Sequence, residues 1–141
     1  MDWTYRIDRS HNLIITKMSG DIDVPETRKT YQAISSDNEF SKDLVVFMDN
    51  TDLRQDTVNY DIIHQEKSLT IDFMAPFTGT RIAVLHDNYK DYGIGRQWEA
   101  ALIDLRVEFR NFMDETEAKE WLGIPTDYVI TTDPSKMPVT G

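Results

Sequence analysis

Residues 44–60 read LVVFMDNTDLRQDTVNY, and this stretch decides the fold that we predict for the chain. The apolar run 44–48 has the composition of a strand that is buried on both faces. The run ends at Asp49, a polar loop follows, and Asp56 is expected to open a helix. A strand that leads into a helix across a short acidic turn can hold a switch residue, a ligand or a partner there.

Four further segments have the pattern of strands. Residues 3–7 alternate between apolar and polar side chains, and residues 13–18 follow after a short turn, which predicts a hairpin. Residues 82–85 are continuously apolar and predict a second strand that is buried on both faces. Residues 107–112 alternate again and predict a last, less buried strand.

Helices are expected between and after these strands. Asp23 is placed to cap the first helix, with Glu26 completing a capping box. Gly123 is placed to end the last helix. The four expected helices cover residues 24–36, 57–73, 91–104 and 115–122.

The predicted fold is therefore α/β, with the element order ββαβαβαβα. We expect a five-stranded mixed sheet in chain order, in which only the first strand is antiparallel to its neighbour. Residues 1–125 are expected to form one domain. Residues 126–141 contain few large apolar groups and are expected to form a loosely attached tail.

The composition restricts the classes of function. The net charge is −10, which repels nucleic acid and anionic membrane surfaces and attracts a basic segment of a protein partner. No apolar stretch approaches the roughly 20 residues that span a bilayer, so no integral membrane association is expected. The chain has no cysteine and no signal-peptide pattern at its start, and we expect a cytoplasmic protein.

Several short motifs occur in a fixed order along the chain. They are YRID at 5–8, NLII at 12–15, SG at 19–20, LVVFMD at 44–49, RIAVL at 81–85, YGIGR at 92–96, EFRNF at 108–112 and EAKEWLG at 117–123. Over residues 3–125 the chain resembles the SpoIIAA-like fold of STAS (anti-anti-sigma factor) domains. It is most similar to the small bacterial STAS/SEC14 domain-containing proteins. The resemblance implies a regulatory protein-interaction module.

The regulated members of that family carry Asp-Ser-Ser-Gly after the third strand, and the second serine accepts a phosphate. Residues 56–59 of this chain, which read DTVN, occupy the same place. The acceptor position is Val58, which has no hydroxyl group. Thr57 lies one residue early, and we expect it to act mainly in the entry to the helix.

Two groups of polar residues are considered, one as a metal site and one as a catalytic site. Asp49, Asp52 and Asp56 are densely spaced, but the spacing matches neither an EF-hand loop nor an aspartyl phosphatase, so no metal and no cofactor are expected. His86 follows a strand and could serve as a base for Thr57, with Asp49 as its third partner, in a hydrolase. This hypothesis ranks last, and we expect the protein not to be an enzyme.

Gly93 lies near the start of the third helix, beside Tyr92 and Arg96, where backbone amides can cradle an anion. The third glycine of a dinucleotide fingerprint is missing, since Trp98 stands in its place. We favour a helix entry that needs small residues against the sheet over an anion site.

The leading hypothesis is protein binding through an edge made of turns and helix starts. Its residues are Asp49, Asp52, Asp56, Thr57, His86, Tyr92, Gly93 and Arg96. The alternative is a small apolar or lipid-like ligand bound between the second and third helices. Its pocket residues are Phe73, Met74, Phe77 and Trp98. The partner and the oligomeric state are left open by the sequence.

Overall fold

The computed structural model describes residues 1–130 of the chain, and its elements follow the order ββαβαβαβα. The strands are β1 (Asp2–Asp8), β2 (Leu13–Asp21), β3 (Val45–Arg54), β4 (Arg81–Leu85) and β5 (Glu108–Phe112). The helices are α1 (Val24–Ser35), α2 (Tyr60–Met74), α3 (Tyr89–Ala101) and α4 (Glu115–Leu122). Three short 3-10 turns lie at Arg9–His11, Ala75–Phe77 and Ile103–Leu105.

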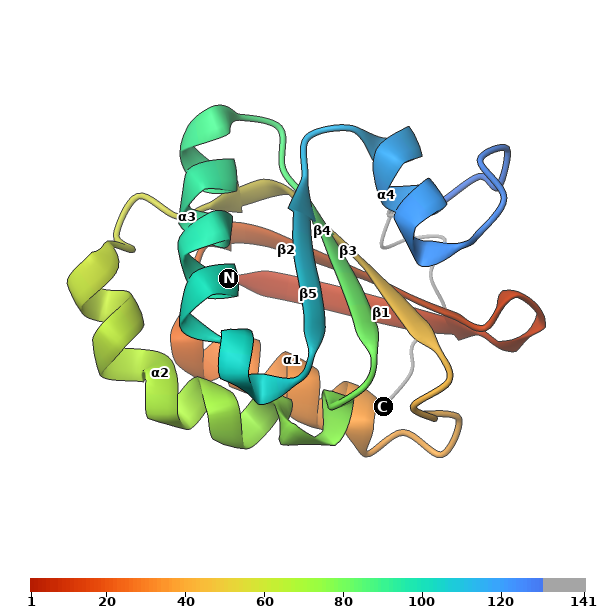
Figure 1. Cartoon of the computed structure of the whole chain (residues 1–141), viewed down its shortest axis with the longest axis horizontal. Helices are drawn as coiled ribbons and strands as arrows, with labels where there is room; N and C mark the ends of the chain where they lie inside the picture. Colours follow the sequence, from red (N-terminus) through yellow and green to blue (C-terminus); the bar gives the residue numbers. More distant parts are fainter. Residues whose placement is uncertain (131–141) are drawn as a thin grey trace.

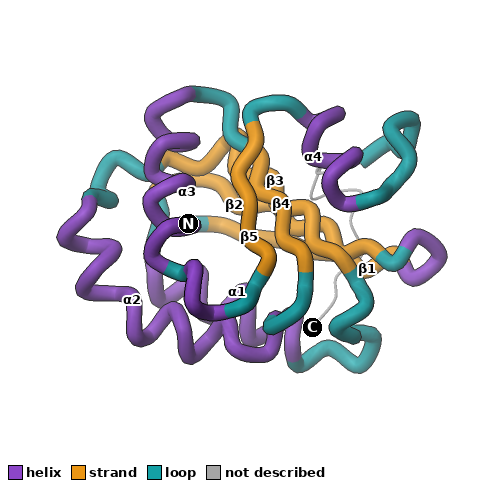
Figure 2. The backbone as a smooth tube through the Cα atoms, in the orientation of Figure 1, coloured by secondary structure: helices purple, strands orange, loops and turns teal. Residues whose placement is uncertain are grey.

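The five strands form one mixed sheet in the order β1-β2-β3-β4-β5 (Figure 2). Only β1 is antiparallel to its neighbour, and β3 and β4 are adjacent parallel strands, with Phe47 opposite Ala83. Both features confirm the predicted sheet. The α/β class with a five-stranded mixed sheet and four helices therefore follows from the pattern of apolar runs.

The helices cover the two faces of the sheet unequally. Helices α1, α2 and α3 lie on one face, and the short α4 lies on the other (Figure 1). Side chains alternate along the central strands, so each strand serves both layers. In β3, Val46 and Met48 belong to the core beneath α1–α3, whereas Phe47 belongs to the core beneath α4.

Strand β3 is longer than predicted and α2 starts later. The strand continues through the acidic residues to Arg54, because β2 also extends and pairs with it up to Asp21, after a bulge near Lys17. Helix α2 begins at Tyr60, and the side chain of Asn59, not that of Asp56, accepts the capping bond from Ile62 N at 2.9 Å. The expectation that Asp56 opens this helix is therefore wrong.

Helix α3, in contrast to α2, starts earlier than predicted. Its cap is Asn88, whose side chain accepts from Asp91 N at 2.9 Å, so Gly93 and Gly95 lie inside the helix and not in a turn before it. Backbone amides in a helix interior already bond to carbonyl groups four residues earlier. The Gly93 segment therefore has no cradle of free amides for the anion that was considered there.

The segment after α4 returns to the first hairpin. The Tyr128 hydroxyl donates to Asp8 Oδ2 at 2.6 Å and accepts from Arg6 Nη2 at 3.2 Å. The Tyr128 ring also lies 4.5 Å from the His11 ring. The predicted tail at 126–141 is thus described only over its first five residues, and the rest lies outside the described residues.

Candidate functional site

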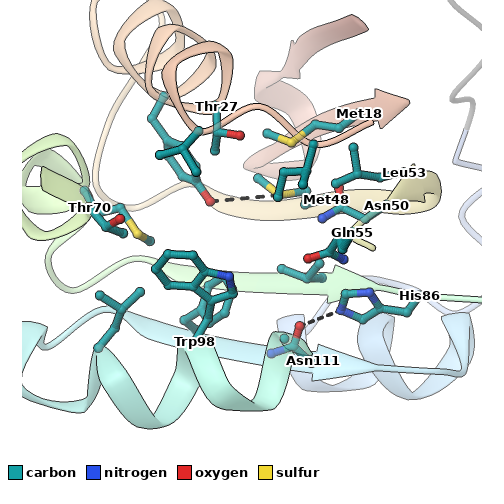
Figure 3. Close-up of a pocket in the computed structure, with 18 of the residues that line it drawn as sticks. Met18, Thr27, Met48, Asn50, Leu53, Gln55, Thr70, His86, Trp98 and Asn111 are labelled. Atoms are coloured by element: carbon teal, nitrogen blue, oxygen red, sulfur yellow. Dashed lines mark hydrogen bonds between the residues drawn. The ribbon is translucent and has the colours of Figure 1, made fainter. Parts of the chain in front are cut away.

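A cavity of about 80 Å³ lies between the sheet and the layer formed by α1, α2 and α3 (Figure 3). Most of its wall is apolar, and it includes the flexible side chains of three methionines. The apolar lining residues are Met18, Ile22, Val24, Met48, Leu53, Phe73, Met74, Val84, Trp98, Leu102 and Phe109, and the others are Thr27, Tyr31, Asn50, Gln55, Thr70, His86, Gly95 and Asn111.

The sheet face beneath α1–α3 changes from apolar to polar toward the carboxyl ends of its strands. Because side chains on one face recur every second residue, Asn50 follows Met48 on this face and His86 follows Val84. In β5, Asn111 follows Phe109 on this face and lies opposite Val84. Three neighbouring strands therefore each place a polar group at the same end of one apolar cavity.

Three polar side chains that line the cavity each have one atom without a hydrogen-bond partner in the protein. Among residues 1–130, four buried side-chain nitrogen or oxygen atoms are unpaired, and three of them line the cavity. They are Asn50 Oδ1, Gln55 Nε2 and His86 Nδ1. Figure 3 shows these three side chains gathered at one end of the cavity, away from Thr70.

The other polar side chains of the cavity are paired. Thr27 Oγ1 donates to the Asp23 carbonyl oxygen at 3.0 Å, and Thr70 Oγ1 donates to that of Glu66 at 2.8 Å. The Tyr31 hydroxyl contacts the Met48 sulfur at 3.9 Å. Because a buried polar group normally has a partner, three unpaired atoms at one place need an explanation.

His86 stands at the inner end of a hydrogen-bonded chain. Its Nε2 lies 2.6 Å from Asn111 Oδ1. The Asn111 side chain and its backbone N–H both donate to Glu99 Oε1, at 2.8 and 2.7 Å. Glu99 in turn pairs with Arg96, 3.4 Å away on the outer side of α3. The imidazole is therefore held in one orientation while its Nδ1 remains unpaired.

Burial decides the charge of this imidazole. His86 is only 2% exposed, and desolvation lowers the pKa of its side chain below the ordinary value. The hydrogen bond to Asn111 opposes this shift in part, as do nearby carboxylates. These carboxylates belong to Asp91, Asp87 and Glu99. His86 is therefore a neutral imidazole at neutral pH.

Gly95 lets α3 approach this pair. A Cβ at Gly95 would overlap Asn111 Oδ1 and would lie 2.8 Å from His86 Nε2, whereas a Cβ at Gly93 would meet nothing within 4 Å. The glycine that the helix requires is thus Gly95. Its role is close packing over the His86–Asn111 hydrogen bond, which agrees with the expectation that small residues are needed against the sheet.

The acidic residues of the predicted interaction edge lie apart from this cavity. Lys17 lies on the α4 side of the sheet, and its Nζ pairs with Asp49 at 3.4 Å and with Asp52 at 2.8 Å. Although desolvation opposes the shift, these two carboxylates raise the pKa of Lys17. Asp56 is exposed and pairs with Lys90 at 2.5 Å. Two cations therefore offset the acidic charge that the sequence places at this edge.

The predicted hydrolase residues are not brought together. Asp49 Oδ1 accepts from the backbone N–H and the hydroxyl of Thr51, at 2.9 and 2.6 Å, while His86 bonds to Asn111. Thr57 lies in the exposed turn before α2. Val58 is buried in a small apolar cluster. Within residues 1–130, no group of three His, Asp or Glu side chains could hold a metal ion.

Tyr92 and Arg96 line a second, outer hollow. This polar groove has a volume of about 470 Å³ and lies between α3, β5 and the start of α4. Arg96 Nη1 donates to the Tyr92 hydroxyl at 3.2 Å. Glu99 and Asn111 line this groove, and Asn111 also lines the inner cavity.

The predicted apolar pocket residues are partly brought together. Phe73, Met74 and Trp98 line the cavity. Phe77 is fully buried below them and packs edge-on against Tyr31, with ring centres 5.2 Å apart. Four polar residues of the site were not predicted from the sequence. Asn50, Gln55 and Asn111 lie in or beside strands, and Glu99 lies in α3. The available signal was a polar residue two positions after an apolar one, as in Met48-x-Asn50, Val84-x-His86 and Phe109-x-Asn111.

No helix within residues 1–130 is long and apolar enough to cross a membrane. No protein-family model matches this chain, and no curated protein matches it either.

Proposed function

We propose that the protein binds a small, mostly apolar ligand with one polar end in the cavity between the sheet and helices α1–α3. The observation that carries this proposal is the convergence of Asn50 Oδ1, Gln55 Nε2 and His86 Nδ1 at one end of an otherwise apolar wall. An unpaired buried polar atom costs about 1–3 kcal/mol, so three of them destabilise the ligand-free protein. A ligand whose polar end pairs with them would remove that cost. The proposed role is binding without catalysis.

The size of the cavity limits the ligand. An apolar cavity of about 150 Å³ accepts benzene, so by the same scale about 80 Å³ leaves room for about three or four non-hydrogen atoms. The cavity can widen to take one or two further atoms, because Met18, Met48 and Met74 line it and methionine side chains rearrange easily. The favoured ligand is therefore a short aliphatic molecule and not a full-length lipid.

A thermal-shift and fluorescence experiment tests the proposal. Trp98 lines the cavity, whereas Trp3 and Trp121 do not, so Trp98 emission reports on occupancy. We expect short aliphatic alcohols and amides to raise the unfolding temperature and to change this emission, and the change should vanish in Trp98→Phe. Native mass spectrometry of protein purified from its own host would detect a retained ligand.

A variant with a filled cavity provides the control. Val84→Phe places a ring in the cavity and should abolish binding while circular dichroism shows an intact fold. Leu102→Phe is a second filler from a different element, in case the first does not fold. If no compound binds the unmodified protein, water satisfies the three polar atoms and the proposal is overturned.

The second candidate is a protein-interaction surface of the SpoIIAA-like kind, supported by the element order and by two exposed tyrosines. Tyr60 and Tyr89 begin α2 and α3 and are 65% and 79% exposed. The Asp56–Lys90 ion pair connects the same two helix starts. Exposed aromatic side chains are frequent at the centres of protein interfaces. This edge would bind a basic segment of a partner.

Titration with a lysine-rich and an arginine-rich peptide tests this second candidate. Backbone NMR signals around Tyr60 and Tyr89 should shift, and added salt should weaken the binding, since charges are screened beyond roughly 8–10 Å at physiological ionic strength. Replacing both tyrosines by serine should abolish the shifts. Shifts confined to the cavity residues would favour the ligand-binding function instead.

A further inference from the structure

We infer that the polar end of the ligand is an uncharged hydroxyl or carboxamide that donates a hydrogen bond to His86 Nδ1. This inference rests on the proposed binding in the cavity and names the chemistry of the ligand. It follows from three features of the site: the orientation of Asn111, the position of the single hydrogen on the His86 ring, and the charges around the cavity.

Glu99 determines the orientation of the Asn111 amide. An ionised carboxylate can only accept hydrogen bonds. Glu99 Oε1 lies 2.8 Å from Asn111 Nδ2 and also accepts from the Asn111 backbone N–H at 2.7 Å. The amide nitrogen therefore faces Glu99, and the amide oxygen Oδ1 faces His86.

The Asn111 oxygen in turn determines the tautomer of His86. Asn111 Oδ1 is an acceptor 2.6 Å from His86 Nε2, so Nε2 must carry the hydrogen. A neutral imidazole has one N–H group, so Nδ1 presents a lone pair to the cavity. Nδ1 can then bind only a group that donates. A ketone, an ether or an ester oxygen has no hydrogen to offer and would face this lone pair unfavourably.

The other two unpaired atoms extend this requirement. Gln55 Nε2 is a donor and needs an acceptor on the ligand. Asn50 Oδ1 is an acceptor and can bind another N–H or O–H hydrogen of the ligand, besides the one given to His86. A hydroxyl group both donates and accepts, so it can satisfy His86 and Gln55 together. A primary carboxamide has two N–H hydrogens and one oxygen, so it has the complement of all three atoms.

The charges around the cavity exclude an ionised ligand. None of the side chains that line the cavity carries a formal charge at neutral pH, because its only titratable members are Tyr31 and His86. The charged groups that act on His86 are the carboxylates of Asp91, Asp87 and Glu99. An anion would be buried without a counter-charge and near three like charges. A cation would also lack an ionised partner in the wall.

The tautomer can be measured without any ligand. Nitrogen-15 chemical shifts of the His86 ring should show a protonated Nε2 and a bare Nδ1 at neutral pH. A ring protonated on Nδ1 would overturn the inference. Asn111→Leu removes the acceptor that selects the tautomer, and the two forms should then mix.

Four probes of equal carbon number test the ligand chemistry: butanol, butyramide, butanone and butyrate. Binding is followed by NMR shifts of the cavity residues and by Trp98 emission. Butanol and butyramide should bind about tenfold more tightly than butanone, since an unpaired lone pair on His86 remains with the ketone. Butyrate should not bind at neutral pH. In Asn111→Leu the preference for butanol over butanone should fall toward onefold.

The outcomes separate this inference from the proposed function. Equal binding of butanol and butanone to the unmodified protein would refute the inference and leave cavity binding intact. Absence of binding by all four probes would refute cavity binding itself, and the inference with it. The comparison of alcohol with ketone uses the unmodified protein, so it does not depend on whether Asn111→Leu folds.

Discussion

The two faces of the sheet differ in how they pair the polar side chains in the middle of β3. On the α4 face, Asp49 accepts from Thr51 and from Lys17. On the α1–α3 face, the next residue, Asn50, has an unpaired oxygen in a cavity. One face therefore ends in a closed polar network, and the other ends in polar atoms that need an external partner.

Buried polar groups that are paired within the protein stabilise the fold, whereas those left unpaired are available to bind a ligand. A paired buried network contributes to stability, whereas an unpaired buried atom costs free energy. Residues that weaken the ligand-free protein without a structural benefit are frequently found at functional sites. Substitutions of neighbouring residues on opposite faces can test this reading directly.

The largest effect is expected for Phe47 and Met48, which are adjacent and face opposite cores. Phe47→Ala should lower the free energy of unfolding by about 3–5 kcal/mol, because it leaves a cavity beneath α4. Met48→Ala should cost about 2–5 kcal/mol and should enlarge the ligand cavity, so larger alcohols should bind better. Chemical denaturation and probe binding measure both. If Phe47→Ala changed the size preference as Met48→Ala does, the two faces would not be independent.

Gly95→Ala is expected to cost about 2–3 kcal/mol, since overpacking typically costs about 1–3 kcal/mol and the His86–Asn111 bond would also be strained. Gly93→Ala in the same helix is the matched control. It should be neutral or stabilise by up to about 1 kcal/mol, because alanine favours a helix and the added methyl group meets nothing. Thermal unfolding measures both variants. Equal effects would show that α3 does not rest on the polar pair.

Asp49→Leu and Asn50→Leu should have unequal effects on stability. Asp49→Leu removes the acceptor of Thr51 and one partner of Lys17, and should cost about 1–3 kcal/mol. Asn50→Leu removes an unpaired oxygen, and should be close to neutral or slightly stabilising, but it should weaken binding of the butyramide probe. A strong loss of stability in Asn50→Leu would mean that its amide supports the fold.

The smallest effect is a pH dependence from His86. Its pKa is lowered in the folded protein, so below the unfolded value of about 6.5 the unfolded chain binds the proton more readily. The stability contribution of the neutral ring is thus present above pH 6.5 and is lost as the pH falls, by at most about 1.4 kcal/mol per pH unit. Denaturation at a series of pH values measures this slope. His86→Gln should reduce it.

The apolar runs at 44–48 and 82–85 predicted the parallel centre of the sheet, because only strands buried on both faces are continuously apolar. The boundaries of β3 and α2 were not predictable in the same way. Asp56 and Asn59 are both good capping residues, and the choice between them depends on how far β2 extends beside β3.

Part of the cavity could be seen in the sequence as well. Phe73 and Trp98 each belong to a helical run of apolar residues, and with Met74 they were predicted to form a pocket. All three line the cavity. The pairing of His86 with Asn111 was not predictable, since the two residues lie 25 positions apart and meet only because β4 and β5 are neighbours.

Local patterns of apolar and polar residues are sufficient for the order of the elements, for the two-layered burial and for the ends of α1 and α4, because each depends on neighbours within a few positions. The polar end of the cavity depends on contacts between distant segments. Strand register places Asn111 beside Val84 and Val84 beside Met48, so that Asn50 and His86 follow at the same end of the sheet. Close packing at Gly95 holds α3 over Asn111 and His86. Only the assembled tertiary structure decides which polar atoms find partners and which remain open to a ligand.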